Sequence, residues 1–248
     1  MKKIIILGIV VFLIALLLKT PANLIAKQVE SNTALTLQGA SGSLWKGNVT
    51  RAVFDGVDVG EVSWTVSPLG LLTGAAKGDF TIQGDELTAN GSYTVSVSKT
   101  LTLDNAQFKT TGSFINQFQR YAKMSGDLRG SIDHLEMQQT DPLSLPVVSA
   151  VLNWEQGGLT SPIRLPEGSY QLKIEPEAEG KLIGVLTAHD APVDIKGNVV
   201  LDSEWQYLTD LKLKTTPKGQ SLQGMISMVG RPKPDGYIHI KEKGKLFK

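Results

Sequence analysis

The chain has 248 residues, no cysteine and a formal net charge of +1. This balance argues against the strongly basic or acidic surface that nucleic acids and highly charged substrates select. Without disulfides, the roughly 220 residues that follow the N-terminal segment must be held together by a sheet and its core. A content of 25 glycines, with frequent Thr, Ser and Val, favours strands and tight turns over helices.

An apolar run of fifteen residues, from 4 to 18, follows Lys2 and Lys3. As a helix it would rise only about 22 Å, whereas a membrane span needs ~20 residues, so we expect the helix to continue through Lys19 towards Ala26. The two N-terminal lysines keep the N-terminus in the cytoplasm by the positive-inside rule. The predicted organisation is a cytoplasmic tip at 1–3, a transmembrane signal anchor at 4–26 and an exported domain at 27–248.

A cleaved secretory signal is the alternative for this segment. A charged start and an apolar stretch are also its signature, and residues 20–22 place small side chains where a signal peptidase cuts. However, the run is long for such a signal, Lys19 interrupts the approach to the cleavage site, and Leu24 and Ile25 continue the apolar character beyond it. We therefore expect an uncleaved anchor, and with either outcome the rest of the chain is exported.

Alternation of apolar and polar residues, typical of strands with one face on a core, runs through the exported part. Turn residues separate the strands at 55–56, 84–85 and 104–105. The pattern predicts an all-β, antiparallel domain with minor helix. The alternating apolar positions are Leu35 and Leu37; Val57 and Val59; Val62, Trp64 and Val66; Phe80 and Ile82; Tyr93, Val95 and Val97; Leu101 and Leu103; Tyr170, Leu172 and Ile174; Val193 and Ile195; Val199 and Leu201; Leu211 and Leu213; and Ile238 and Ile240.

One stretch instead has the spacing of a helix. Between Ser113 and Met124 the apolar residues recur every three or four positions, with Ser113 as the N-cap. We expect this helix, at 113–124, to connect or cap two similar halves of the domain. A second short helix is expected at 221–229.

A duplicated unit is indicated by four landmarks that recur in the same order. A tryptophan precedes a glycine by fourteen residues twice, at Trp64 and at Trp154. A Ser-Gly turn before each tryptophan, and a glycine and a Lys-Thr-Thr sequence after it, recur as well. The predicted halves extend over about 41–111 and 125–216. Chance recurrence of Gly, Ser and Thr is the alternative, which the equal offset of the tryptophans disfavours.

Residues suited to catalysis or metal binding form no recognisable constellation. His134, His189 and His239 are isolated in sequence from one another and from paired carboxylates. The sequence also lacks the nucleophile-elbow, zinc-protease and phosphate-loop motifs. We therefore expect no enzymatic activity, no catalytic residue, no cofactor and no metal ion.

Two apolar elements close to the anchor carry the candidate packing or docking residues, and we expect them to form one membrane-proximal patch. The first is a turn from Gly42 to Gly47, whose glycines permit tight backbone geometry and whose Trp45 offers a large ring. The second begins at Trp64 and contains an apolar loop. Burial of Trp45 in a hairpin is the simpler interpretation, and contact with a partner is the alternative. The candidate residues are Gly42, Leu44, Trp45, Gly47, Trp64, Pro68, Leu71, Leu72 and Gly74.

In these two elements the chain resembles the type II secretion system protein N family. That family carries Gly-x-Leu-Trp-x-Gly followed by Trp-x-x-x-Pro-x-x-Leu-Leu-x-Gly, matched here at 42–47 and 64–74. The resemblance covers nearly the whole chain. It implies a non-enzymatic, single-pass accessory protein of the bacterial inner membrane whose periplasmic β domain contacts other secretion-system subunits. Arg129 stands where a second copy of the first motif would have tryptophan, so a role of Trp45 would belong to one half only.

Lipid binding or lipid carriage is the alternative function. Anchored, glycine-rich β chains that begin with such a turn are also similar to periplasmic proteins whose sheets hold lipid. A lipid groove needs an apolar face that stays open, whereas a scaffold buries it. The strands supply apolar residues for one face only, and the sequence leaves open whether that face is covered. The expected partners are the inner membrane, other secretion-system subunits and, in this alternative, lipid; nucleic acid is not expected.

Overall fold

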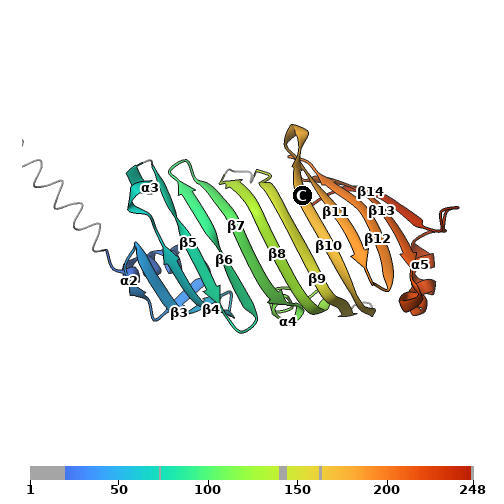
Figure 1. Cartoon of the computed structure of the whole chain (residues 1–248), viewed down its shortest axis with the longest axis horizontal. Coiled ribbons are helices and arrows are strands. Elements are labelled where there is room, and N and C mark those ends of the chain that lie inside the picture. Colours follow the sequence, from blue (N-terminus) through green and yellow to red (C-terminus); the bar gives the residue numbers. More distant parts are fainter. Residues whose placement is uncertain (1–19, 73, 140–143, 162–163, 247–248) are drawn as a thin grey trace, which may run out of the picture. The chain divides into compact units, whose positions relative to one another are not determined.

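The computed structural model describes residues 20–72, 74–139, 144–161 and 164–246. Its strands form one antiparallel sheet in which, apart from the short β2, each strand pairs with the next along the chain (Figure 1). This confirms the predicted all-β antiparallel class with minor helix. Residues 1–19, which hold most of the predicted membrane span, lie outside the described part of the chain. Within that part, no helix combines the length and the apolar character that crossing a membrane requires.

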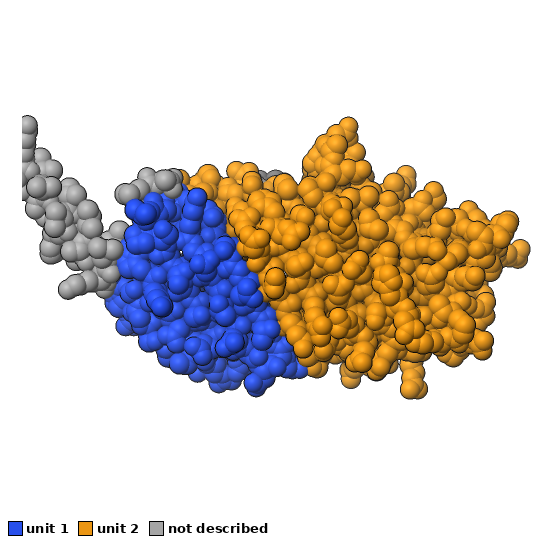
Figure 2. All heavy atoms as spheres, in the orientation of Figure 1, with its two compact units in different colours: residues 1–94 blue, residues 95–248 orange. Residues whose placement is uncertain are grey.

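Two compact units divide the chain at Thr94 (Figure 2). Unit 1 begins with a helix against three strands and ends in β6, which extends slightly past the boundary. Its elements are α2 (Ala22–Asn32), β1 (Leu35–Gln38), β2 (Ser41–Gly42), β3 (Lys46–Phe54), β4 (Val57–Thr65), α3 (Pro68–Leu72), β5 (Ala75–Gln83) and β6 (Leu87–Ser96).

Unit 2 is a longer meander of the same kind, with short helices between some of its strands. Its elements are β7 (Thr100–Thr111), α4 (Gly112–Ile115), β8 (Lys123–Gln138), β9 (Val147–Ser161), β10 (Leu165–Glu177), η1 (Ala178–Gly180), β11 (Lys181–His189), β12 (Val193–Leu201), β13 (Gln206–Thr215), η2 (Pro217–Leu222), α5 (Gln223–Val229) and β14 (Ile238–Lys245).

The helix expected to continue from the apolar run towards Ala26 is interrupted. Pro21 has an extended backbone, with φ −76° and ψ 148°, and α2 begins only at Ala22. Pro21 also forms an isolated bridge with Ser43. A proline lacks the amide hydrogen that a continuing helix would use. The prediction of a helix continuing towards Ala26 is therefore wrong at Pro21, which bridges to Ser43 one residue before α2 begins.

The helix predicted at 113–124 is also wrong in extent. Only Gly112–Ile115 is α-helical, and its N-cap is Thr111, whose side chain accepts a hydrogen bond from the Phe114 amide at 3.2 Å. The side-chain amide of Asn116 then donates to the backbone carbonyl of Met124 and accepts from its backbone N–H, each at 2.8 Å. These side-chain bonds to the backbone compete with helical bonds, so the segment closes as a loop before β8.

Of two predicted turns, the one at 55–56 connects two strands, whereas the one at 104–105 lies within a strand. Asp55 and Gly56 join β3 to β4 with φ of 49° and 81°, the geometry of a tight hairpin turn. Asn105 also has a positive φ of 51°, yet it lies within β7. The pairing with β8 keeps one register on both sides of Asn105, with Asp104 opposite His134 and Ala106 opposite Ile132, so the expected turn at 104–105 is a local distortion within a continuous strand.

Cross-strand register places apolar side chains on one side of the sheet in each unit. In unit 1, Val62 pairs with Val49; in unit 2, Leu172 pairs with both Leu152 and Leu186. Directly paired residues of an antiparallel sheet project to the same side, so these pairs extend one apolar face from strand to strand.

A compact apolar cluster lies at the C-terminal end of unit 2. Its buried members are Val193, Leu222, Ile226 and Ile238. They come from β12, η2, α5 and β14, so the helical segment covers this end of the apolar face. The helix predicted at 221–229 is therefore confirmed, with α5 occupying Gln223–Val229.

The two tryptophans on which the predicted repeat rests lie in similar hairpins. Trp64 pairs with Phe80 across β4 and β5, and Trp154 pairs with Tyr170 across β9 and β10. The equal offset of the tryptophans thus reflects the same cross-strand register in two hairpins. The later landmarks lie in β6 and β12, so β11 has no counterpart in the first half.

Candidate functional site

The turn from Gly42 to Gly47 is built so tightly that only glycine fits at either end. Gly42 has φ of 85°, and a Cβ there would lie 2.5 Å from the carbonyl oxygen of Lys46. A Cβ at Gly47 would lie 2.5 Å from the ring of Trp64. Inside the turn, the amide of Ser43 donates to the carbonyl of Lys46 at 2.9 Å. The two glycines of the first motif are therefore explained by close packing.

The same turn fastens the first described residues of the chain to the sheet. The amide of Leu44 donates to the carbonyl of Thr20 at 2.9 Å, next to the bridge between Pro21 and Ser43. Directly after this contact, α2 places Ala22 and Ala26 in buried positions, with exposed fractions of 1% and 5%. The last residues of the predicted span, 20–26, are thus held by the turn and by α2.

The two tryptophans of the motifs connect the turn to β4. The indole nitrogen of Trp64 donates to the carbonyl of Leu44 at 3.1 Å. The amide of Val66, just after β4, donates to the carbonyl of Trp45 at 2.7 Å. A buried indole N–H usually needs such a partner, so Trp64 contributes both apolar area and a fixed bond to the turn.

The second motif continues into α3. The amide of Ser67 donates to the carbonyl of Lys77 at 2.6 Å, and the amide of Gly70 donates to the carbonyl of Ser67 at 3.2 Å. A Cβ at Gly70 would lie 2.7 Å from the carbonyl of Ala75, so α3 packs closely on the start of β5. The side chain of Leu69 is 73% exposed.

The structure places the two motifs side by side, because Lys46 at the start of β3 pairs with Thr65 at the end of β4. The turn precedes this pair and α3 follows it. Pro68 opens α3, Leu71 and Leu72 belong to its backbone, and Gly74 follows it with φ of 74°. The side chains of Leu71 and Leu72 lie outside the described part of the structure.

Two shallow polar hollows next to the motifs were not anticipated. The first is lined by Lys46, Asn48, Glu61, Ser63 and Asp79, together with the glycines of the turn and the end of β4. The second continues from Asp79 to Ser92 and Tyr93. The signal that could have revealed them is the row of polar residues at every second position of β3 and β4.

Asp79 organises the polar side of these hollows. The hydroxyl of Ser92 donates to the carboxylate of Asp79 at 2.7 Å, and the backbone amide of Asp79 donates to the hydroxyl of Thr65 at 3.2 Å. Burial, reinforced by the negative charge of Asp79, raises the pKa of Tyr93, whose hydroxyl donates to the carbonyl of Thr65 at 3.2 Å. These bonds satisfy the polar groups within the sheet and do not converge on a reacting centre.

His134 and His239 have partners that their isolation in sequence concealed. Nδ1 of His134 lies 2.7 Å from the carboxylate of Asp104 on the neighbouring strand. Nε2 of His239 lies 2.8 Å from Asp235. Among the described residues, no group of three or more His, Asp or Glu side chains is placed to hold a metal ion. His134 and His239 therefore each contact a carboxylate locally.

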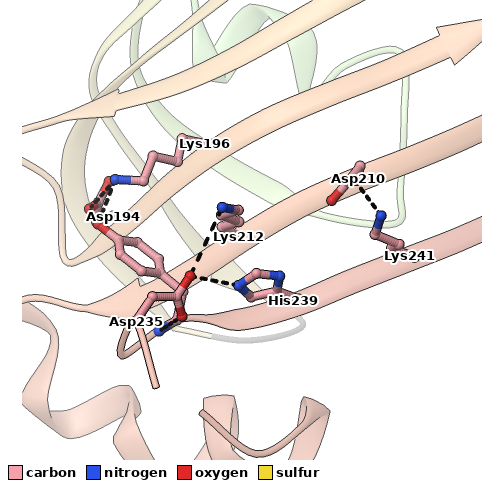
Figure 3. A network of polar contacts seen from close by, with 8 residues as sticks. Asp194, Lys196, Asp210, Lys212, Asp235, His239 and Lys241 are labelled. Carbon is pink, nitrogen blue, oxygen red and sulfur yellow. Dashed lines mark hydrogen bonds and ion pairs between the residues drawn. The ribbon is translucent and has the colours of Figure 1, made fainter. Parts of the chain in front are cut away.

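The second of these pairs belongs to a network on the polar side of β12 to β14 (Figure 3). Asp235 contacts His239 and, at 3.9 Å, Lys212. Its pKa is held below the usual value, first by the bond from His239 and then by the backbone amide of Tyr237. The Tyr237 hydroxyl in turn accepts a bond from Lys196 at 2.6 Å, which raises the pKa of that lysine. These contacts tie the last strands together.

The site is thus a backbone-fixed turn beside a short helix, at one end of an antiparallel sheet. Residues 33–241 match the family model described as type II secretion system (T2SS), protein N. The chain therefore belongs to the type II secretion system protein N family and is a component of that secretion apparatus. It is 25% identical, over 97% of its own length and 96% of the relative's, to the type II secretion system protein N of Aeromonas hydrophila. No solved structure matches it.

Proposed function

We propose that this chain is a non-enzymatic accessory component of the type II secretion apparatus, anchored in the inner membrane and acting through protein contacts of its periplasmic β domain. The observation that carries the proposal is the bond from Leu44 in the Gly42 to Gly47 turn to Thr20, directly after the apolar run. A domain tied to its own anchor in this way is held close to the membrane, where other subunits of such an apparatus can reach it.

The surface proposed for docking is α3 with the adjoining turn. Leu69 is exposed although it stands in the most apolar segment near the anchor, and the backbone around it is fixed by its bonds to β5. A large apolar side chain on a rigid support is typical of the anchor residues at protein interfaces. The glycines and Trp64 around it serve packing, and Leu69 is the proposed contact residue among the described side chains of α3.

The test compares Leu69 with Val97, an apolar residue that is 86% exposed in the turn after β6. In full-length chains expressed at native level, Leu69→Arg is expected to lower export of a secreted protein severalfold, whereas Val97→Arg leaves export unchanged. A photocrosslinker at Leu69, and not one at Val97, should capture another secretion-system subunit. Normal export by Leu69→Arg together with no capture at Leu69 would contradict the proposed docking surface.

Lipid binding is retained as a second candidate because of one observation, the apolar face of unit 2. One side of strands β8 to β12 is apolar in its central rows, and the middle of that side is only half-buried. A lipid-binding protein needs an apolar face that stays open, whereas a scaffold protein buries it.

A further inference from the structure

One face of unit 2 is apolar across five successive strands, β8 to β12. Its central rows are formed by directly paired residues, which project to the same side of an antiparallel sheet. We call this surface the apolar face and define it by the central residues of these rows, which are Ala150, Leu152, Leu172, Ile174, Leu186 and Val199.

The two sides of these strands differ sharply in charge. On the opposite side, Arg129 pairs with Glu155 at 3.3 Å and Lys173 with Glu175 at 2.7 Å. On the apolar face, the positions of β8 to β12 in register with Leu172 carry aliphatic, aromatic or glycine residues. An occupant of this face must therefore bring hydrocarbon and no charge.

Described helical segments cover only the ends of the face. α4 packs on β7 and β8, whereas η2 and α5 contribute Leu222 and Ile226 to the cluster beside β12 (Figure 1). Between them, Leu152, Leu172 and Leu186 remain half-buried. Aliphatic side chains that keep contact with water over several adjacent strands form a surface on which an apolar partner gains free energy.

Two buried hydroxyls on this face point to the chemistry of the occupant. Thr110 is 3% exposed and Tyr170 is 7% exposed, and neither hydroxyl has a hydrogen-bond partner among the described residues. Thr110 pairs with Leu128 and Tyr170 pairs with Trp154, so both lie on the apolar side. A buried donor without an acceptor is costly, which favours an occupant that carries oxygen acceptors next to its hydrocarbon.

The dimensions fit a lipid chain. Five strands at about 4.8 Å spacing extend over roughly 19 Å, and the six-residue step from Val148 to Trp154 along β9 covers about 20 Å. One leaflet accounts for half of the ~30 Å hydrocarbon core of a bilayer, so an acyl chain needs about 15 Å. A single chain therefore fits on the face without leaving its edges.

We propose that the apolar face binds the acyl chain of a membrane phospholipid, with an ester oxygen accepting from Tyr170 or Thr110. A helix of a partner protein already uses its backbone carbonyls internally, so its backbone offers these hydroxyls no free acceptor. An acyl ester supplies both the hydrocarbon that the apolar face requires and an oxygen acceptor for the buried hydroxyls. The proposal concerns β8 to β12 and does not depend on docking through Leu69, so each can fail without the other.

The test uses neighbouring residues on one strand that face opposite sides. Val185 is 37% exposed on the polar side of β11, and Leu186 follows it on the apolar face. A photoreactive phenylalanine derivative is placed at either position in the full-length chain, in cells whose phospholipids are labelled with radioactive phosphate. We expect a labelled adduct from Leu186 at least tenfold stronger than from Val185.

Several outcomes would overturn the proposal. These are equal labelling at both positions, no labelling at Leu186, or an adduct at Leu186 with a protein, including a second copy of this chain. Protease resistance of both full-length variants shows that they fold. If the derivative unfolds the chain at Leu186, the pair Leu172 and Lys173 on β10 gives the same comparison. Combining Tyr170→Phe and Thr110→Val with the derivative at Leu186 should lower the lipid adduct severalfold, because both donors to the ester are removed.

Discussion

At the scale of single residues, a turn can require glycine for its positive φ or for lack of space, and Gly42 and Gly56 differ in the second of these. Both have positive φ, at 85° and 81°, but a Cβ at Gly42 meets the Lys46 carbonyl whereas one at Gly56 meets nothing within 4 Å. Gly56→Ala is therefore expected to cost only about 1–2 kcal/mol of backbone strain. Gly42→Ala should cost a further ~1–3 kcal/mol through overlap.

Urea unfolding of the full-length variants in detergent measures both values. Equal losses in the two variants would show that the close approach to Lys46 contributes nothing. The sequence predicted a turn at 42–47 from its glycines, because glycine spacing reports local backbone geometry. It did not predict that Trp64 donates to Leu44, since that bond joins residues twenty positions apart.

At the scale of elements, the loop after α4 shows why periodicity alone misassigned a helix. Phe114 and Phe118 have helical spacing, and their rings do meet edge to face at 5.2 Å. The side chain of Gln119, however, accepts bonds from the amides of Tyr121 and Ala122, both at 2.9 Å. A spacing rule counts apolar positions and takes no account of amide side chains that cap the backbone.

Removing that cap should weaken the loop. Gln119→Ala leaves two amides without their acceptor and is expected to destabilise the chain by about 1–2 kcal/mol. Arg120→Ala, at the exposed neighbouring position, is the matched control and should stay within ~0.5 kcal/mol of the parent. Chemical unfolding of the full chain gives both values; a Gln119→Ala variant as stable as the control would show that water replaces the side chain.

The stability of the chain should depend on pH through Asp235, which lies just before the last strand. Its pKa lies below the ordinary value of 3.8 because His239 and the Tyr237 amide bond the carboxylate. A depressed pKa in the folded chain stabilises it at pH values above 3.8, and this contribution is lost as the pH falls below that value. Asp235→Asn should therefore destabilise the chain at pH 7, and the difference from the parent should shrink below pH 3.8.

Urea midpoints measured from pH 7 to pH 3 provide the comparison, with Asp85→Asn in the exposed turn after β5 as control. A difference for Asp235→Asn that stays constant over this range would show that the carboxylate bond does not contribute. The alternation at Ile238 and Ile240 predicted this strand, and the structure confirms it as β14. The ion pairs escaped prediction because His239 and Asp235 meet only after the chain turns at 236, where Gly236 has φ of 78°.

At the scale of the whole molecule, the sequence predicted the antiparallel β class but left four strands, besides the two-residue β2, without a clear alternating pattern. These were β3, β8, β9 and β11, which contain bulges, glycines or apolar residues on both faces. In β8, for example, the register shifts between Ser125 and Asp127 around Gly126, whose φ is 88°. A bulge moves the following side chains to the other face, so the period of two is lost in sequence although the strand continues.

Anchoring by the N-terminal segment is the remaining prediction at this scale. If residues 4–26 serve as an uncleaved signal anchor, the mature chain begins at Met1 or Lys2 and stays in the membrane after extraction at alkaline pH. Replacing Val10 and Val11 by arginine places two charges in the middle of the run, each costing about 2.5–3.5 kcal/mol at the centre of a span. That double variant should fail to insert, whereas Lys19→Arg, which keeps the charge at the end of the run, should behave like the parent. A mature N-terminus near Asn23 or Lys27 would instead establish a cleaved signal. The bond from Leu44 to Thr20 would then lie on a segment removed with the signal, and the turn at 42–47 would have to be explained by its packing against Trp64 alone.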